Sequence, residues 1–292
     1  MKCSIAALAV LTMPIWLHAQ SPAPAGSPLT RHYREGETLT YHMTATNDDW
    51  HYTADATGVV KKTARGGYAE EFRWTGMTSD GQPVTLAPTM MEYRQSLSLD
   101  PSTFPSAPDL KVDQRLVGPI TDLMTFYVDM WLTNRTAVLK QPGDHFHVPN
   151  PQVSSWADGV QVTQGQDHID FDLNFLSIDP ANRTAVVVVH HVPPVKPNIE
   201  FPAAWMQTPI ADTPNNWVEV RKTQDGKFQA GAGKETFDVS LTISTADGRI
   251  LSATMDNPVM TTNRECEDAA LTRCGDAKVH TIHRHVEIVL EH

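Results

Sequence analysis

The chain has few cysteines, no excess of basic residues and almost no long hydrophobic runs. Three cysteines occur in 292 residues, and 23 Lys and Arg stand against 34 Asp and Glu, a net charge of −11. An electrostatic field of that sign repels nucleic-acid phosphates, so we expect no nucleic-acid partner. Hydrophobic residues make up 40% of the chain, which is enough to build a core.

Motifs for catalysis and for cofactors are also missing. The sequence has no Gly-x-Ser-x-Gly elbow, Walker loop, His-Glu-x-x-His helix, EF-hand loop or Gly-x-Gly-x-x-Gly turn. The acidic pairs Asp48-Asp49 and Glu70-Glu71 fall at a turn and in a predicted strand, where neighbouring side chains face opposite ways. We therefore expect no cofactor, and a non-catalytic role is favoured over an enzymatic one.

The one long apolar run is N-terminal and covers residues 5–17, after the basic Lys2. With the small residue Ala19 before Gln20, it is typical of a bacterial signal peptide over residues 1–19. The run is shorter than the roughly 20 residues that span a bilayer, although an uncleaved anchor is the alternative. No later segment approaches a transmembrane run, and we expect a periplasmic or secreted protein.

Two cysteines, Cys266 and Cys274, follow the signal peptide. In an oxidising compartment such a pair is expected to form a disulfide, which contributes about 2.5 kcal/mol for so short a loop in the chain-entropy account. A metal site is the alternative, but the segment between the cysteines contains no histidine.

Strand patterns dominate the rest of the chain. Residues 20–34 are rich in Pro, Ser, Ala and Gly and predict a flexible leader, and residues 35–292 predict a single β-rich domain. Apolar and polar residues alternate in segments such as 39–45 and 237–243, the pattern of half-buried strands. The turns Asp225-Gly226 and Asp247-Gly248 predict hairpins. The last strand is predicted over about 279–290, with the disulfide in the loop before it.

One segment has helical periodicity. From Gly118 and Pro119 to Arg135, apolar residues recur at three- and four-residue steps, which predicts an amphipathic helix over about 119–135 with Pro119 in its first turn. The opposite, polar stripe consists of Asp122, Thr125, Asp129 and Thr133. The predicted fold is mainly β (α+β), a large twisted antiparallel sheet or half-barrel with one main helix packed against it.

A sheet that curves around a helix can enclose a cavity. Tyr127, Met130 and Trp131 on the apolar helix face are the candidates for binding an apolar small molecule or a lipid. An ordinary packed core is the alternative, because a core needs aromatic residues for the same reason.

Histidines suggest a second kind of site. His145 and His147 lie on one side of a predicted strand, and His168 and Asp170 lie on one face of another. If these strands are neighbours, the four side chains are suitable ligands for zinc or another divalent ion. The alternative is that they occupy the hydrated faces of their strands.

Other histidines occur near the C-terminus. His283 and His285 share a strand face with Glu287, while His280 lies on the opposite face. Such a group can respond to pH below about 6.5, although a polar face on an outer strand is the plainer interpretation. The neighbours His190 and His191 point to opposite faces and cannot bind one ion together.

The chain resembles a group of exported bacterial β-rich proteins. The segments that carry this resemblance lie between about residues 118 and 257 and read GPITDLMTFYVDMWL, DHFHVPN, SSWADG, DTPNNWVEV and KETFDVSLTISTADGRILSATMDN. The resemblance implies no particular activity. The order of features is also similar to the half-barrel with a helix found in periplasmic lipoprotein carriers, a likeness of fold alone.

Three functions follow from these patterns. The first is an exported non-catalytic protein that binds an apolar or amphipathic ligand in the cell envelope. The second is an envelope scaffold or partner-binding protein with a filled core. The third is a metal-assisted hydrolase that uses His145, His147, His168 and Asp170. A cavity under the helix would favour the first over the second, and clustering of the four ligands would favour the third.

Overall fold

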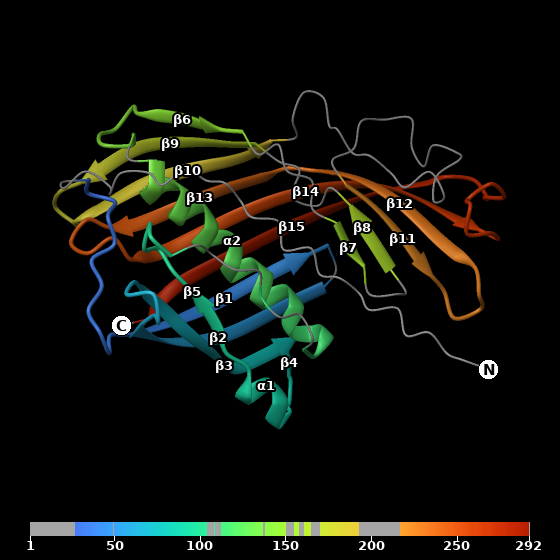
Figure 1. Ribbon diagram of the computed structural model, residues 1–292, viewed down its shortest axis with the longest axis horizontal. Helices are drawn as coiled ribbons and strands as arrows, with labels where there is room; N and C mark the ends of the chain where they lie inside the picture. The colour runs from blue at the N-terminus through green and yellow to red at the C-terminus, as the bar shows by residue number, and fades with distance from the viewer. Residues whose placement is uncertain are drawn as a thin grey trace.

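The chain folds into a large open antiparallel sheet with one main helix (Figure 1). The computed structural model describes residues 27–48, 50–103, 108, 112–136, 138–149, 155–157, 161–164, 170–192 and 217–291. The predicted fold class is confirmed. Within this part of the chain, no helix is long and apolar enough to cross a membrane.

The elements follow one another along the chain in a simple order. They are β1 (Thr38–Asn47), β2 (Trp50–Lys62), β3 (Tyr68–Ser79), β4 (Gln82–Pro83), α1 (Pro88–Glu92), β5 (Gln95–Leu97), α2 (Gln114–Thr136), β6 (His145–Val148), β7 (Ser155–Ala157), β8 (Gln161–Gln164), β9 (Asp170–Asp179), β10 (Thr184–Val192), β11 (Trp217–Lys222), β12 (Phe228–Glu235), β13 (Phe237–Ser244), β14 (Ile250–Cys266) and β15 (Lys278–Glu291).

The sheet has two parts that share its longest strands. In the main half, the strand order is β4-β3-β2-β1-β15-β14-β13-β10-β9-β6. Strands β12 and β13 are separated only by Thr236, and both pair with β14, at residues 259–266 and 250–256 respectively. Beyond β12 the sheet continues as β11, β8 and β7. We call this second part the arm: β7, β8, β11, β12, and residues 259–266 and 278–282 of β14 and β15 (Figure 1).

The main half curves around α2, which lies across its inner face (Figure 1). Leu123, Phe126 and Met130 of α2 have no exposed surface and belong to one hydrophobic cluster with inward side chains of the sheet. Full burial of one such side chain contributes about 1.5–3 kcal/mol. The wide apolar helix face predicted from the sequence therefore forms the centre of the core.

The helix begins earlier than predicted, at Gln114, so that Pro119 lies inside it. The reason is a cap: the Asp113 carboxylate accepts a hydrogen bond of 3.0 Å from the Arg115 N–H. Pro119 removes one helical hydrogen bond, which a long and well-packed helix tolerates. The Thr121 hydroxyl donates to the nearby carbonyls of Val117 and Gly118, both at 2.9 Å.

Residues 27–34 pack against the main half, in contrast to the flexible leader predicted over residues 20–34. Leu29 is only 1% exposed, and the His32 N–H donates to the Asp247 carbonyl at 2.7 Å. The Arg31 guanidinium donates to the Glu37 carboxylate at 2.7 Å. The composition of this segment is typical of a flexible leader, and it does not reveal that Leu29 and Arg31 anchor the segment to the sheet. The segment predicted to be a signal peptide, residues 1–19, and residues 20–26 lie outside the described part.

The disulfide and both hairpin turns are confirmed. Cys266 and Cys274 are bonded across the loop between β14 and β15. Gly226 and Gly248 have φ of +83° and +72°, a conformation that favours glycine. A Cβ atom on Gly248 would lie 2.3 Å from the Thr30 carbonyl oxygen, so this turn is also where residues 27–34 approach the sheet.

Candidate functional site

The three helix residues predicted to line a cavity lie inside the packed core. Tyr127, Met130 and Trp131 are 1%, 0% and 4% exposed and belong to the main hydrophobic cluster. The Tyr127 ring packs edge-on against Phe72 and Tyr41, at centroid distances of 5.7 and 6.5 Å. Their role in ligand binding stays a prediction, and this packing favours a filled interior.

The polar stripe of α2 is buried rather than turned to solvent. Asp122, Asp129 and Thr133 are 1%, 0% and 3% exposed. The sequence periodicity separates the two stripes of the helix, but it does not show that the sheet curves far enough to cover both. The side chains that pair with the two aspartates offset the cost of burying them, and they lie on strands far away in the sequence.

Asp122 is held by two strands of the main half. The Tyr52 hydroxyl of β2 and the Arg284 guanidinium of β15 each donate to one of its carboxylate oxygens. Burial raises the pKa of Asp122, while Arg284 and Tyr52 act in the opposite direction. The carboxylate is thus part of a buried ion pair that ties the N-terminal half of α2 to β15.

Asp129, two helical turns further on, is held by His191 of β10. The His191 Nε2 lies 2.7 and 2.8 Å from the two carboxylate oxygens. The imidazole is enclosed by the rings of Phe171 and Phe237, at centroid distances of 4.8 and 5.0 Å. Burial raises the pKa of Asp129, and His191 lowers it. As predicted, His190 points to the other face of the sheet, where it pairs with Asp238.

A third carboxylate lies where β12 passes into β13. Burial raises the pKa of Glu235 to about 7, while a hydrogen bond with Asn257 and electrostatic interactions with Arg284 and His191 lower it. The Asn257 amide also donates to the Thr236 carbonyl at 2.8 Å and fixes the bend.

A separate buried group fastens residues 27–34. Glu70 has no exposed surface, and it accepts a hydrogen bond of 3.0 Å from the Tyr33 hydroxyl. The Arg31 guanidinium lies 3.5 Å from the other Glu70 oxygen. Burial raises the pKa of Glu70 to about 7. Its neighbour Glu71 faces outward and pairs with Lys61, which confirms the predicted alternation.

Two of the four metal-ligand candidates, His147 and Asp170, lie close together on the outer face of the sheet. The His147 Nδ1 is 2.6 Å from Asp172, and its Nε2 is 3.5 Å from Asp170. His145 is paired in register with Asn174, and His168 lies outside the described part. Among the residues whose positions are known, no three or more His, Cys, Asp or Glu side chains are grouped to hold a metal ion. The hydrolase hypothesis therefore gains no support from this geometry.

His147 belongs to a row of histidines and aspartates across the outer face. Directly paired positions of β6, β9, β10, β13, β14 and β15 hold His147, Asp172, His190, Asp238, Asp256 and His285. Each His Nδ1 in the row lies 2.6–2.7 Å from an Asp of a neighbouring strand. His285 also contacts Glu287 at 3.1 Å, which confirms their predicted shared face. Sequence reasoning missed the row because strand register cannot be read from alternation alone.

The arm has an open sheet edge along residues 278–282 of β15. Strand β1 ends opposite Arg284, and within the described ranges no other strand pairs with this side of β15. Asp48 closes the pairing: its N–H donates to the His283 carbonyl, and its carboxylate accepts from the His283 N–H, both at 3.1 Å. Because backbone groups alternate sides along a strand, those of Val279 and Thr281 face the same open side as those of His283.

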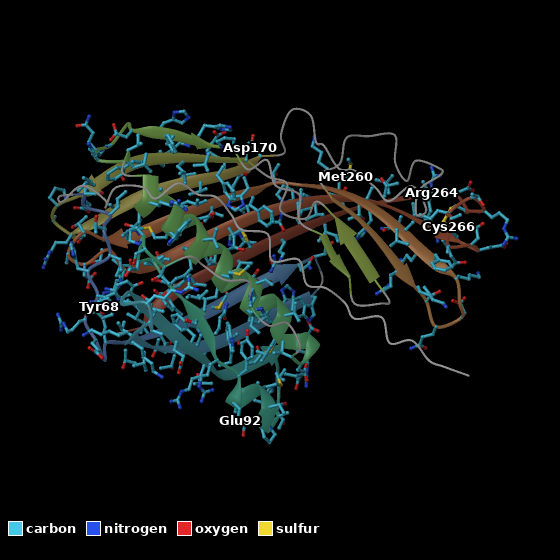
Figure 2. All side chains as sticks on the ribbon, in the orientation of Figure 1. Tyr68, Glu92, Asp170, Met260, Arg264 and Cys266 are labelled. Carbon is cyan, nitrogen blue, oxygen red and sulfur yellow. A yellow bond between two sulfur atoms is a disulfide. The ribbon has the colours of Figure 1, made fainter. Side chains whose placement is uncertain are left out.

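The open edge is exposed to solvent, and its strand is held by pairing with β14 and by the disulfide that precedes it. Val279 is 66% exposed, the highest value among the large hydrophobic side chains described. Directly before β15, the Cys266–Cys274 disulfide closes the loop from β14, and Met260, Arg264 and Cys266 follow one another along the arm (Figure 2). Within the described part of the chain, the edge therefore presents backbone groups that pair with no other strand, and β14 holds the strand from its other side.

Comparisons of the chain with protein-family models, with curated proteins and with solved structures give no match.

Proposed function

We propose that the chain is an exported, non-catalytic protein of the cell envelope that binds a protein partner by strand addition at the open edge of the arm. The observation that carries the proposal is the unpaired edge at Val279 and Thr281. Such an edge is a template for one more strand, and proteins that use this mode gain affinity from main-chain hydrogen bonds.

The packed interior supports binding outside the core rather than beneath α2. An apolar ligand would have to displace Tyr127, Met130 and their neighbours, which are enclosed by the sheet. It would also have to break the buried ion pair of Asp122 with Arg284 and the buried hydrogen bonds between Asp129 and His191. The edge needs no such rearrangement, because the disulfide and β14 already hold the strand in place, and a preorganised site lowers the entropy lost on binding.

Export is part of the proposal and has its own test. The N-terminal pattern and the disulfide both suit an oxidising compartment outside the cytoplasm. N-terminal sequencing of the protein from the periplasmic and medium fractions of its host should read from Gln20. A protein recovered only with Met1 in the cytoplasmic fraction would contradict export.

The strand-addition test uses two valines of β15 that differ in their surroundings. A photo-crosslinking amino acid replaces either Val279, beside the open edge, or Val289, which is 51% exposed but lies between β14 and β1. We expect a defined cross-linked partner from position 279 in intact host cells and none from position 289. Equal labelling at both positions, or none at either, contradicts the proposal.

A substitution that removes one backbone N–H then distinguishes a partner that pairs with the edge from a partner that only lies near position 279. Thr281→Pro removes a donor on the open side without touching the β14 ladder, whereas the control Thr281→Val keeps that donor. Loss of this main-chain hydrogen bond, worth about 0.5–1.5 kcal/mol, should lower cross-linking at position 279 by up to about tenfold. Unchanged cross-linking in the proline variant would mean that the partner does not pair with this edge.

A further inference from the structure

Arg264 of β14 lies on the same face of the arm as the exposed Val279 of β15. Thr262 is directly paired with Val279, and Arg264 is two positions further along β14. Directly paired residues point to the same face of a sheet, and so do residues two positions apart on one strand. Arg264, which is labelled in Figure 2, therefore stands one strand in from the open edge, on the surface that carries Val279.

The guanidinium of Arg264 has no acceptor among the residues that the structure describes. Its Nε is buried without a hydrogen-bond partner, and no ion pair joins it to another described side chain. A buried donor without an acceptor is unfavourable, and such groups are rare in native proteins. A carboxylate supplied by a bound partner would satisfy it, because a guanidinium binds a carboxylate through two parallel hydrogen bonds.

The rest of this face is basic as well. Lys222 of β11 and Lys234 of β12 are exposed, and the strand register places both on the side of Arg264. The described side chains that β11, β12, β14 and β15 contribute to this face of the arm include no Asp or Glu, since Glu235 and Glu265 lie on the opposite face. In a chain with a net charge of −11, this face is a local region of positive charge.

We propose that the strand which adds at the open edge belongs to an acidic partner, and that one of its carboxylates binds Arg264. This inference rests on the strand addition proposed above and names the chemistry of the partner. Neighbouring strands lie about 4.8 Å apart, so the added strand would run about 10 Å from β14, a distance that an arginine and a glutamate side chain span together. Main-chain pairing accepts many sequences, and the guanidinium selects among them.

Short synthetic peptides with blocked termini, in which Val alternates with Glu, with Gln or with Lys, measure this selection. The mature chain carries the photo-crosslinking amino acid in place of Val279, and labelling by each peptide is compared at equal concentration. We expect the Glu peptide to label about tenfold more than the Gln peptide, because hydrogen bonds between charged groups are stronger than those to a neutral amide. The Lys peptide should label least.

The overall negative charge of the chain favours the opposite order, so the expected preference cannot arise from net charge. Equal labelling by the Glu and Gln peptides, or a preference for the Lys peptide, would overturn the inference.

Variants assign the preference to Arg264. Arg264→Gln should remove most of the preference for Glu over Gln, whereas Arg264→Lys should keep part of it. The control Arg221→Gln changes an exposed arginine on the opposite face of the same arm, where it donates to Gln229, and should behave like the wild-type chain. An Arg264→Gln protein with the full preference would overturn the assignment.

A charge reversal covers the case in which Arg264→Gln does not fold. Lys234→Glu changes an exposed residue of the same face, and it should lower labelling by the Glu peptide and raise labelling by the Lys peptide. Labelling that is unaffected by this reversal would overturn the basic character of the binding face.

Cross-linking at position 279 in host cells separates this inference from the strand addition on which it rests. No labelling by any peptide, together with no partner captured in cells, would overturn strand addition itself. A partner captured equally well by the wild-type chain and by Arg264→Gln would leave strand addition standing and overturn the acidic partner. A cross-link from position 279 to the chain's own residues would overturn both.

Discussion

Loss of Arg284 should destabilise the protein more than loss of an exposed arginine, because Arg284 neutralises the buried Asp122. We expect Arg284→Met to lower the free energy of unfolding by about 3–5 kcal/mol, since the change leaves a buried carboxylate without its cation. Urea unfolding at pH 7 measures the loss. The control Arg273→Met removes an exposed pair with Glu267 and should change stability by less than about 1 kcal/mol. Equal losses in the two variants would contradict the buried role of Arg284.

At this scale, the sequence predicted pairs that are close along the chain and missed those that are far apart. The Cys266–Cys274 bond and the shared face of His285 and Glu287 depend on short spacings. The pairing of Asp122 with Arg284 spans 162 positions, and nothing in the local pattern connects the two residues. The sequence identified both buried helix aspartates only as a polar stripe.

At the scale of elements, Asp113 decides where α2 begins. Asp113→Ala should destabilise the protein by about 0.5–2 kcal/mol, whereas Asp113→Asn, which keeps a capping oxygen, should lose less. Thermal unfolding of both variants tests this. The Arg115 side chain and N–H lower the pKa of Asp113 to about 2, so its stabilising effect should persist at pH 4 and disappear as the pH falls through that value. Equal losses in the two variants would mean that the cap is unimportant.

The disulfide belongs to the arm rather than to the core. We expect the double variant Cys266→Ala and Cys274→Ala to lose about 2.5 kcal/mol, and to lose protection against hydrogen exchange first in β12 and at residues 259–266. The main half should keep its protection, because its cluster is separate from the small one around Cys266 and Leu271. Simultaneous loss of protection in α2 would contradict that separation.

Strands and the main helix were predictable because each carries its own periodicity. The arm was not, since it depends on β14 pairing with β13 along one part and with β12 along the other. Alternation shows which residues share a face but not which strand is the neighbour. The anchoring of residues 27–34 was missed for a related reason, because Arg31 and Tyr33 contact Glu70, which is far away in the sequence.

For the whole molecule, the buried glutamates predict greater stability in mild acid than in mild base. Burial raises the pKa of both Glu70 and Glu235 to about 7, above the value of about 4.3 in an unfolded chain. Their contribution is therefore complete below about pH 4.3 and is lost as the pH rises through 7. Hydrogen bonds with Asp172 and Asp256 raise the pKa of His147 and of His285, which acts in the same direction.

Thermal unfolding from pH 5 to pH 8.5 checks this prediction. The melting temperature should fall across the range in the wild-type chain and much less in the double variant Glu70→Gln and Glu235→Gln. The control variant Glu71→Gln and Glu265→Gln changes two glutamates on the outer surface, each paired with a lysine, and should follow the wild-type chain. A melting temperature that rises toward pH 8.5 would contradict the raised pKa values of both glutamates.

The filled interior is the claim that separates partner binding at the arm from ligand binding beneath α2, and native mass spectrometry of the protein purified from its own host tests it most directly. We predict the mass of residues 20–292 with one disulfide, with or without a protein partner, and with no bound lipid. A lipid or other apolar molecule retained in a one-to-one ratio would contradict the filled core and would support the ligand-binding function that the sequence suggests.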